Sequence, residues 1–254
     1  MKSFFSKKSI LGTMAVAAVC MLGTSNAQAQ EFTIQGDLVS SYVWRGIYQG
    51  GAASFQPTLG FSVGNFSLTA WGSTSLSESN KEIDLTAAYK FGEAGPTLSV
   101  ATLWWDGQAD VANGELTNNY FHFKSGDTGH HFEAGLAYTL PIEKFPLSIA
   151  WYTMFAGADR KTTDEGEEKQ AYSSYVELNY PFSVKGVDLN ATCGVVPYKT
   201  PQYNVNGFAV TNLALKATKA INFNDKFSLP IFAQAIWNPC VEDAFLVFGV
   251  TLRP

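Results

Sequence analysis

Charged side chains that alternate with apolar ones are the residues of this sequence best placed to do chemistry. Side chains two residues apart in an extended chain point to the same face, so such charges gather on one side of a strand. There they either line an aqueous path or pair with one another, because an unpaired charge away from water is costly. The alternation assigns five acids and three bases to this set, together with Gln35: Asp37, Arg45, Asp84, Lys90, Glu133, Glu177, Asp188 and Lys216.

Arg45 stands out in this set because a guanidinium can bind a carboxylate through two parallel hydrogen bonds. It lies beside Trp44 and Gly46, near the end of the first predicted strand. We expect Arg45 either to form a constriction with carboxylates or to make a structural ion pair, which is the simpler interpretation.

Three histidines, His122, His130 and His131, offer imidazoles, which are common zinc ligands. No cysteine and no His-Glu-x-x-His spacing accompanies them. We therefore expect exposed loop histidines, no metal site and no cofactor. Cys193 and Cys240 are too few for a disulfide framework, and we expect them to be unpaired.

The first 29 residues have the composition of a secretory signal peptide. Three lysines precede an apolar stretch at 10–23, and Ala27-Gln28-Ala29 supplies a small-residue cleavage site. We expect cleavage after Ala29, which leaves one domain at 30–254 with 14 Lys plus Arg against 22 Asp plus Glu. This acidic balance argues against nucleic acid as a partner.

Period-two alternation recurs through the rest of the chain and predicts strands. At 82–91, apolar Ile83 and Leu85 alternate with Glu82 and Asp84. Segments near ten residues match the length that a tilted strand needs to cross a bilayer. The pattern predicts about twelve strands: 32–48, 54–64, 66–76, 82–92, 96–105, 130–140, 147–157, 171–183, 187–198, 208–222, 227–238 and 243–253.

The predicted connections alternate between short and long, as in outer-membrane barrels, where the short turns are periplasmic. The short ones are 64–65, 92–95, 140–146, 184–186 and 222–226. The loops on the outer side are 49–53, 77–81, 106–129, 158–170, 199–207 and 239–242. The segment 120–124 alternates weakly, and we expect it to extend the sixth strand or to fold within the third loop.

Aromatic side chains with a polar tip favour the two membrane interfaces. Those near outer strand ends are Trp44, Trp104, Trp105 and Trp237, and those near the other rim include Tyr89 and Tyr180. These features predict an all-β fold, a transmembrane antiparallel up-and-down β-barrel. A soluble β-sandwich also alternates, but its loops are less regularly asymmetric.

Several short motifs occur in an order that resembles the TorF family of outer-membrane porins. They are Ser41 to Gly46, Pro57 to Gly60, Trp71 to Ser73, Glu82 to Leu85, Tyr120 to His122 and Gly129 to Ala134. The resemblance implies an outer-membrane barrel of the porin type, and it brings no catalytic residues with it.

We therefore expect an outer-membrane porin-like channel for passive diffusion of small hydrophilic solutes, with weak cation preference from the acidic excess. The expected partners are outer-membrane lipid, lipopolysaccharide, the barrel-insertion machinery during biogenesis, and the solutes. A plugged barrel with a structural or surface-interaction role is the main alternative, because twelve strands give a lumen of intermediate width. An outer-membrane esterase or lipase is a further alternative, disfavoured because the polar residues face inward.

Overall fold

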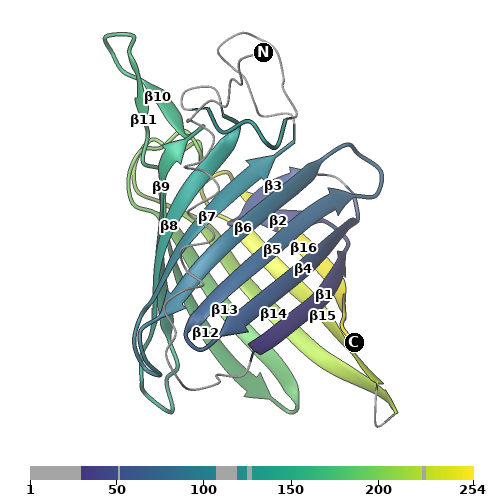
Figure 1. Ribbon diagram of the computed structural model, residues 1–254. Coiled ribbons are helices and arrows are strands. Elements are labelled where there is room, and N and C mark those ends of the chain that lie inside the picture. Colours follow the sequence, from purple (N-terminus) through teal and green to yellow (C-terminus); the bar gives the residue numbers. More distant parts are fainter. Residues whose placement is uncertain (1–29, 51, 107–118, 125–127, 225–226) are drawn as a thin grey trace, which may run out of the picture.

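Twelve antiparallel strands close into a barrel in the computed structural model, which describes residues 30–254 apart from 51, 107–118, 125–127 and 225–226 (Figure 1). The predicted signal peptide lies outside the described residues. Each strand pairs with its neighbours along the chain, and β1 closes the barrel by pairing with both β4 and β16. The barrel strands are β1 (Gln30–Val39), β4 (Ser54–Val63), β5 (Phe66–Ser75), β6 (Lys81–Lys90), β7 (Thr97–Trp105), β8 (His130–Thr139), β9 (Ser148–Gly157), β12 (Ser174–Val184), β13 (Val187–Val196), β14 (Ala209–Asn224), β15 (Phe227–Asn238) and β16 (Asp243–Leu252).

The predicted all-β barrel of about twelve strands is thus confirmed, and its alternation has a clear physical origin. In β6, Ile83 and Leu85 point outward and are exposed, whereas Glu82 points inward and is buried. Inward residues pair across the strands, for example Glu82 with Trp105 and Asp84 with Leu103. The charged residues of β6 thus lie on its inner face and its large apolar residues on its outer face, as a period of two requires.

The connections differ in length between the two ends of the barrel. At one end β4 and β5 are joined by Gly64 and Asn65, and β12 and β13 by Lys185 and Gly186. Lys185 and Gly186 have φ of 49° and 76°, the left-handed pair that a tight hairpin of this twist requires. At the other end several loops are longer, and the hairpin of β10 (Arg160–Thr162) and β11 (Glu168–Gln170) projects beyond the barrel (Figure 1).

The outer face of the barrel carries large exposed apolar side chains. Phe32 is 72% exposed and Leu246 is 60% exposed, on strands that lie close together around the barrel closure. A closed barrel leaves no open sheet edge, so a surface of this kind suits the hydrocarbon of a bilayer. Among the described residues no helix has the length and apolar character needed to cross a membrane.

The first predicted strand, 32–48, was too long. The chain leaves the barrel wall after Val39 and forms a separate hairpin of β2 (Tyr42–Trp44) and β3 (Ile47–Gly50). Its turn is made by Arg45 and Gly46, with φ of 51° and 83°. We call residues 42–50 the lumen hairpin, because its contacts place it inside the barrel.

Candidate functional site

The lumen hairpin reaches several parts of the barrel wall at once. The carbonyl oxygen of Gly46 accepts a hydrogen bond of 3.1 Å from Asn238 Nδ2 of β15. A Cβ on Gly46 would lie 1.8 Å from the backbone oxygen of Thr211 of β14. At the other end of the hairpin, the ring of Tyr42 lies 5.5 Å from that of Trp71 of β5. The hairpin therefore spans the lumen, and Figure 1 shows it within the outline of the barrel.

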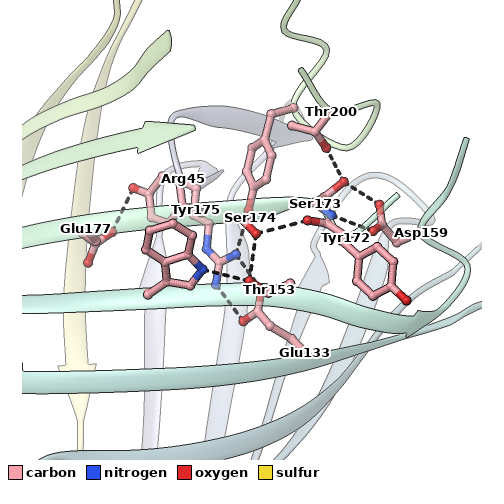
Figure 2. Close-up of polar contacts among 12 residues, drawn as sticks. Arg45, Glu133, Thr153, Asp159, Tyr172, Ser173, Ser174, Tyr175, Glu177 and Thr200 are labelled. Atoms are coloured by element: carbon pink, nitrogen blue, oxygen red, sulfur yellow. Dashed lines mark hydrogen bonds and ion pairs between the residues drawn. The ribbon is translucent and has the colours of Figure 1, made fainter. Parts of the chain in front are cut away.

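Arg45 at the hairpin tip binds Glu133 of β8 in a fork. Its Nη1 and Nη2 donate to the two carboxylate oxygens at 2.7 and 2.8 Å (Figure 2). Nη1 also donates to the Tyr203 hydroxyl at 2.7 Å. The two charged side chains are only 12% and 6% exposed. A bidentate, charge-assisted pair of this geometry is among the strongest polar contacts a protein makes.

Aromatic rings enclose the guanidinium of Arg45. Its Cζ lies 4.6 Å from the ring centroids of Trp44 and Tyr152 and 4.9 Å from that of Tyr175. Such rings attract a cation through their negative faces, more strongly where water is displaced. The sequence hypothesis of an Arg45–carboxylate pair is thus realised, but on the lumen hairpin rather than at the end of the first wall strand.

Trp44 and Trp105 do not lie at an outer membrane interface, where we expected them. Trp105 points into the lumen from β7, and its ring lies 5.4 Å from that of Trp44. Trp44 also stacks on Tyr203, at 5.6 Å. The correction has a simple reason: Trp105 follows the inward parity of β7, and Trp44 belongs to the hairpin.

The other predicted aromatic residues point outward. Tyr89 and Tyr180 lie near the short-turn end of the barrel, 5.0 Å from Phe91 and 5.8 Å from Phe182 between ring centroids. Trp237 is half exposed on β15. Trp104 points outward from β7 but is buried, because Tyr120 of the third loop packs on it at 5.5 Å.

The seven predicted lumen residues of the barrel wall all lie on inward positions of their strands. The strand registers pair them with other inward residues, for example Asp84 with Trp71 and Glu177 with Gly194. Lys90 and Asp188 lie near the short-turn end, and Glu133 lies beside the lumen hairpin. The full set is Asp37, Asp84, Lys90, Glu133, Glu177, Asp188 and Lys216.

Hydrogen bonds occupy some of these carboxylates. Glu177 accepts from the Tyr175 hydroxyl at 2.9 Å and from Asn179 Nδ2 at 2.6 Å. Asp37 accepts from Gln35 Nε2 at 3.3 Å. The polar set is therefore partly a structural network along the inner wall, and not a row of free charges.

Glu82 was absent from the predicted set, although it is the most buried acid of β6. It is inward, as its alternation with Ile83 and Leu85 indicates, and it lies beside Tyr42 and Trp105 around a small cavity. The alternation was the signal that could have found it. What the sequence could not indicate is that the lumen hairpin would bury it.

The histidine expectation was wrong for two of the three residues. His130 and His131 are both buried on β8, and as neighbours on a strand their side chains point to opposite faces. His131 faces the lumen, where its ring lies 5.1 Å from that of Trp105. Adjacent imidazoles in this arrangement cannot share one ion.

His130 faces outward and fastens the third loop to the barrel. Its Nε2 lies 2.6 Å from the Tyr120 carbonyl oxygen, and its Nδ1 lies 2.6 Å from the Thr102 hydroxyl. Because a carbonyl can only accept, the neutral ring carries its proton on Nε2 and accepts from Thr102 at Nδ1. Phe123 stacks on the imidazole at 4.4 Å. The segment around 120–123 therefore folds back over the outside of the barrel and does not extend β8.

A buried carboxylate stabilises the connection between β9 and β12 and its contact with one other outer loop. Asp159, which is 2% exposed, accepts from Ser173 N at 2.8 Å and from Ser173 Oγ at 2.5 Å. Ser173 also contacts the Thr200 hydroxyl, so the loops before β12 and β14 are linked (Figure 2). Burial raises the pKa of Asp159, and the hydrogen bonds from Ser173 and Gln170 oppose that rise.

Cys193 and Cys240 are free, as expected. Residues 60–64, Gly-Phe-Ser-Val-Gly, match the Gly-x-Ser-x-Gly pattern of serine hydrolases. That pattern needs a strand-to-helix turn, whereas Ser62 lies within β4 and pairs with Ser67 of β5. The match therefore carries no catalytic geometry.

No protein-family model and no curated protein matches the chain. The resemblance to the TorF family therefore stays a prediction. Several solved structures are similar over most of the chain at low identity. An outer-membrane channel from Pseudomonas putida F1 is 10% identical, with 91% of this chain and 98% of that chain covered and a TM-score of 0.42. The translocator domain of the autotransporter NalP from Neisseria meningitidis is 12% identical, with coverages of 96% and 94% and a TM-score of 0.37. A bacterial polysaccharide outer membrane secretin is 12% identical, with coverages of 91% and 100% and a TM-score of 0.35.

Proposed function

We propose that the protein is an outer-membrane channel through which small hydrophilic solutes diffuse passively, with the lumen hairpin as its constriction. The observation that carries the proposal is the character of the inner face between the hairpin and the short-turn end. Small polar side chains line it and are only half buried, as expected for a wall that faces water: Thr58, Ser67, Thr69, Thr86, Ser99, Thr192 and Thr218.

The outer face supports the membrane location in this proposal. Exposed apolar side chains on every second residue would be unstable in water over so large a surface. Aromatic residues gather near the short turns, which supports the proposal that this rim lies at a membrane interface. The short turns would then lie in the periplasm and the long loops outside.

Selectivity in this proposal follows from the charges beside the hairpin. Glu82 and Asp84 lie on β6, and Glu133 lies on β8, with β7 between them. Arg45 is the cation bound to Glu133. The remaining negative charge should favour cations or neutral solutes over anions.

Single-channel conductance of the folded protein in a planar bilayer tests this function. We expect stable unitary steps, a reversal potential that indicates cation preference, and larger steps for Arg45→Ala, which releases the hairpin tip. Asp84→Asn should reduce the cation preference. A clear preference for anions, or steps that none of these changes alters, would contradict the proposal.

A plugged barrel with a structural or surface-interaction role is the second candidate, and one observation favours it. The hairpin contacts wall strands around the lumen. Its turn is held by the ion pair of Arg45 with Glu133 and by the hydrogen bond from Asn238 to the Gly46 carbonyl oxygen. A correctly folded barrel that stays electrically silent, together with a hairpin deletion that conducts, would support this candidate over the open channel.

A further inference from the structure

The groups that hold the Arg45 guanidinium belong mostly to the barrel wall and not to the hairpin. We call them the guanidinium site, which consists of one carboxylate and three tyrosines: Glu133 of β8, Tyr152 of β9, Tyr175 of β12 and Tyr203 of the loop between β13 and β14. Trp44 adds a further ring from the hairpin itself. A complete set of ligands for a cation therefore stands on the wall, and Arg45 reaches it from a separate segment.

The wall holds the ring of Tyr175 in place through its own contacts. A Cβ on Gly194 of β13 would lie only 1.9 Å from the Tyr175 hydroxyl oxygen, so the ring occupies space that this glycine leaves free. The hydroxyl donates to Glu177 at 2.9 Å and accepts from Asn212 Nδ2 at 3.1 Å. The orientation of Tyr175 therefore does not depend on Arg45.

The other two tyrosines are held in a similar way. Tyr152 lies opposite Gly135 of β8, and a Cβ on that glycine would approach two carbons of its ring to 3.0 Å. The ring of Tyr203 stacks on that of Tyr175, with 5.8 Å between the centroids. These contacts lie within the wall and one outer loop, so we expect the guanidinium site to keep its shape when Arg45 leaves it.

The chemistry of the site favours a guanidinium over other cations. The two oxygens of Glu133 accept from the two terminal nitrogens of Arg45, a match that a planar fork makes and a primary ammonium cannot. The flat, weakly hydrated guanidinium also packs on aromatic rings. Anions are excluded by the carboxylate.

We propose that this site binds solutes that carry a terminal guanidinium group, in competition with Arg45, and that their binding releases the tip of the lumen hairpin. A tethered group such as Arg45 competes at an effective concentration on the order of millimolar, so a free solute must be supplied above that level. The role of the site in permeation rests on the proposed channel function. Within it, a guanidinium solute would widen its own path past the constriction.

The variant Arg45→Ala empties the site, and an added guanidinium compound should refill it. The probe is ethylguanidinium chloride, exchanged for NaCl at constant ionic strength and far below denaturing concentrations, with ethylammonium chloride as the matched probe. We expect a saturable rise in the unfolding temperature of Arg45→Ala in detergent, because a ligand that binds the folded state stabilises it. The rise with ethylammonium should be several-fold smaller.

Two further proteins separate this site from general effects of the probe. The double variant Arg45→Ala with Glu133→Gln should show no rise, because the carboxylate that accepts the fork is gone. Arg160→Ala removes an exposed arginine of β10 and should show no rise either. Equal rises with both probes, or an undiminished rise in the double variant, would overturn the proposal.

If Arg45→Ala does not fold, Arg45→Lys takes its place, since lysine keeps the charge and cannot form the fork. Ethylguanidinium should still stabilise that variant more than ethylammonium does, and the absence of such a difference would overturn the proposal. In planar bilayers, ethylguanidinium should raise the unitary conductance of the unaltered protein more than ethylammonium. Saturable stabilisation of an electrically silent barrel would refute only the channel, and conduction without guanidinium-specific stabilisation only the site.

Discussion

Arg45 and Glu133 are 88 residues apart in the chain, and their side chains form a bidentate ion pair that joins the tip of the lumen hairpin to β8. The pair is almost fully buried and is surrounded by aromatic rings. It therefore fixes the hairpin across the lumen through a contact that would be weak at the surface and is strong where water is excluded.

Removing one partner of this pair should cost more than removing both. Arg45→Ala leaves Glu133 buried without a cation, and we expect a loss of about 3 to 5 kcal/mol in the free energy of unfolding. The double variant Arg45→Ala with Glu133→Ala should lose less than Arg45→Ala alone, because no unpaired charge remains. Urea unfolding of the unaltered protein, Arg45→Ala, Glu133→Ala and the double variant measures the coupling energy between the two side chains. A loss of unfolding free energy in the double variant equal to the sum of the two single losses would contradict a direct pair.

Gly46 should tolerate no side chain. It has φ of 83°, and a Cβ there would collide with the backbone oxygen of Thr211. We expect Gly46→Ala to destabilise the folded barrel by about 2 kcal/mol or more, or to displace the hairpin from the lumen. The control is Gly166→Ala, at a φ of 81° in open space in the β10–β11 turn, which isolates the backbone strain from the collision. Losses of equal size at both positions would indicate that the lumen contact is unimportant.

His130 should control the docking of the third loop on the outer face. His130→Ala removes the contacts with the Tyr120 carbonyl and the Thr102 hydroxyl, and it leaves Phe123 without its stacking partner. We expect limited proteolysis to cleave the loop between β7 and β8 several-fold faster in this variant, with no change in the barrel core. An unchanged cleavage rate would show that Trp104 and Tyr120 hold the segment by themselves.

The same hydroxyl and imidazole also allow the enzyme alternative to be tested. Thr102 and His130 are hydrogen-bonded on the outward face, as a nucleophile and its base would be. We expect no hydrolysis of p-nitrophenyl esters by the folded barrel above a protein-free control. Hydrolysis that is lost in both Thr102→Val and His130→Ala would assign a catalytic role to this pair.

Asp159 should make the outer loops less stable as the pH rises. Burial raises its pKa in the folded protein, so the folded state binds a proton in a pH range where the unfolded state has lost it. Stability from this group is therefore full at pH values below the ordinary aspartate pKa, and it is lost as the pH rises through the raised value. The difference in unfolding temperature between the unaltered protein and Asp159→Asn should change in that direction between pH 4 and pH 7. A difference that does not vary with pH would contradict a raised pKa.

The two faces of β6 should respond oppositely to the same new charge. Leu85 points outward and is exposed, and its neighbour Thr86 points inward. We expect Leu85→Arg to cost about 2 to 4 kcal/mol in a lipid bilayer if it lies near the midplane, whereas Thr86→Arg should fold and alter conductance. Folding yield into liposomes, compared with yield in detergent, separates the two effects. Equal yields for both variants would contradict a lipid-facing outer surface.

The sequence by itself determined the number of strands, the direction in which their side chains point and the positions of the tight turns. These features depend on neighbours within a few residues: alternation between Glu82 and Ile83 sets the face, and Lys185-Gly186 can adopt the φ values of a tight turn. The sequence also placed Asp84 and Glu133 on the inner wall, because the alternation of side chains between the two faces of a strand is a local property.

Only the tertiary structure decided where residues 42–50 lie. Their alternation is the same whether they extend β1 or form a separate hairpin, and this is why the first strand was predicted too long. The choice depends on partners far along the chain, Glu133 for Arg45 and Asn238 for Gly46, the latter 192 residues away. The burial of Glu82 follows from that choice, because it is set by contacts across a closed barrel and not by the residues next to Glu82 in sequence.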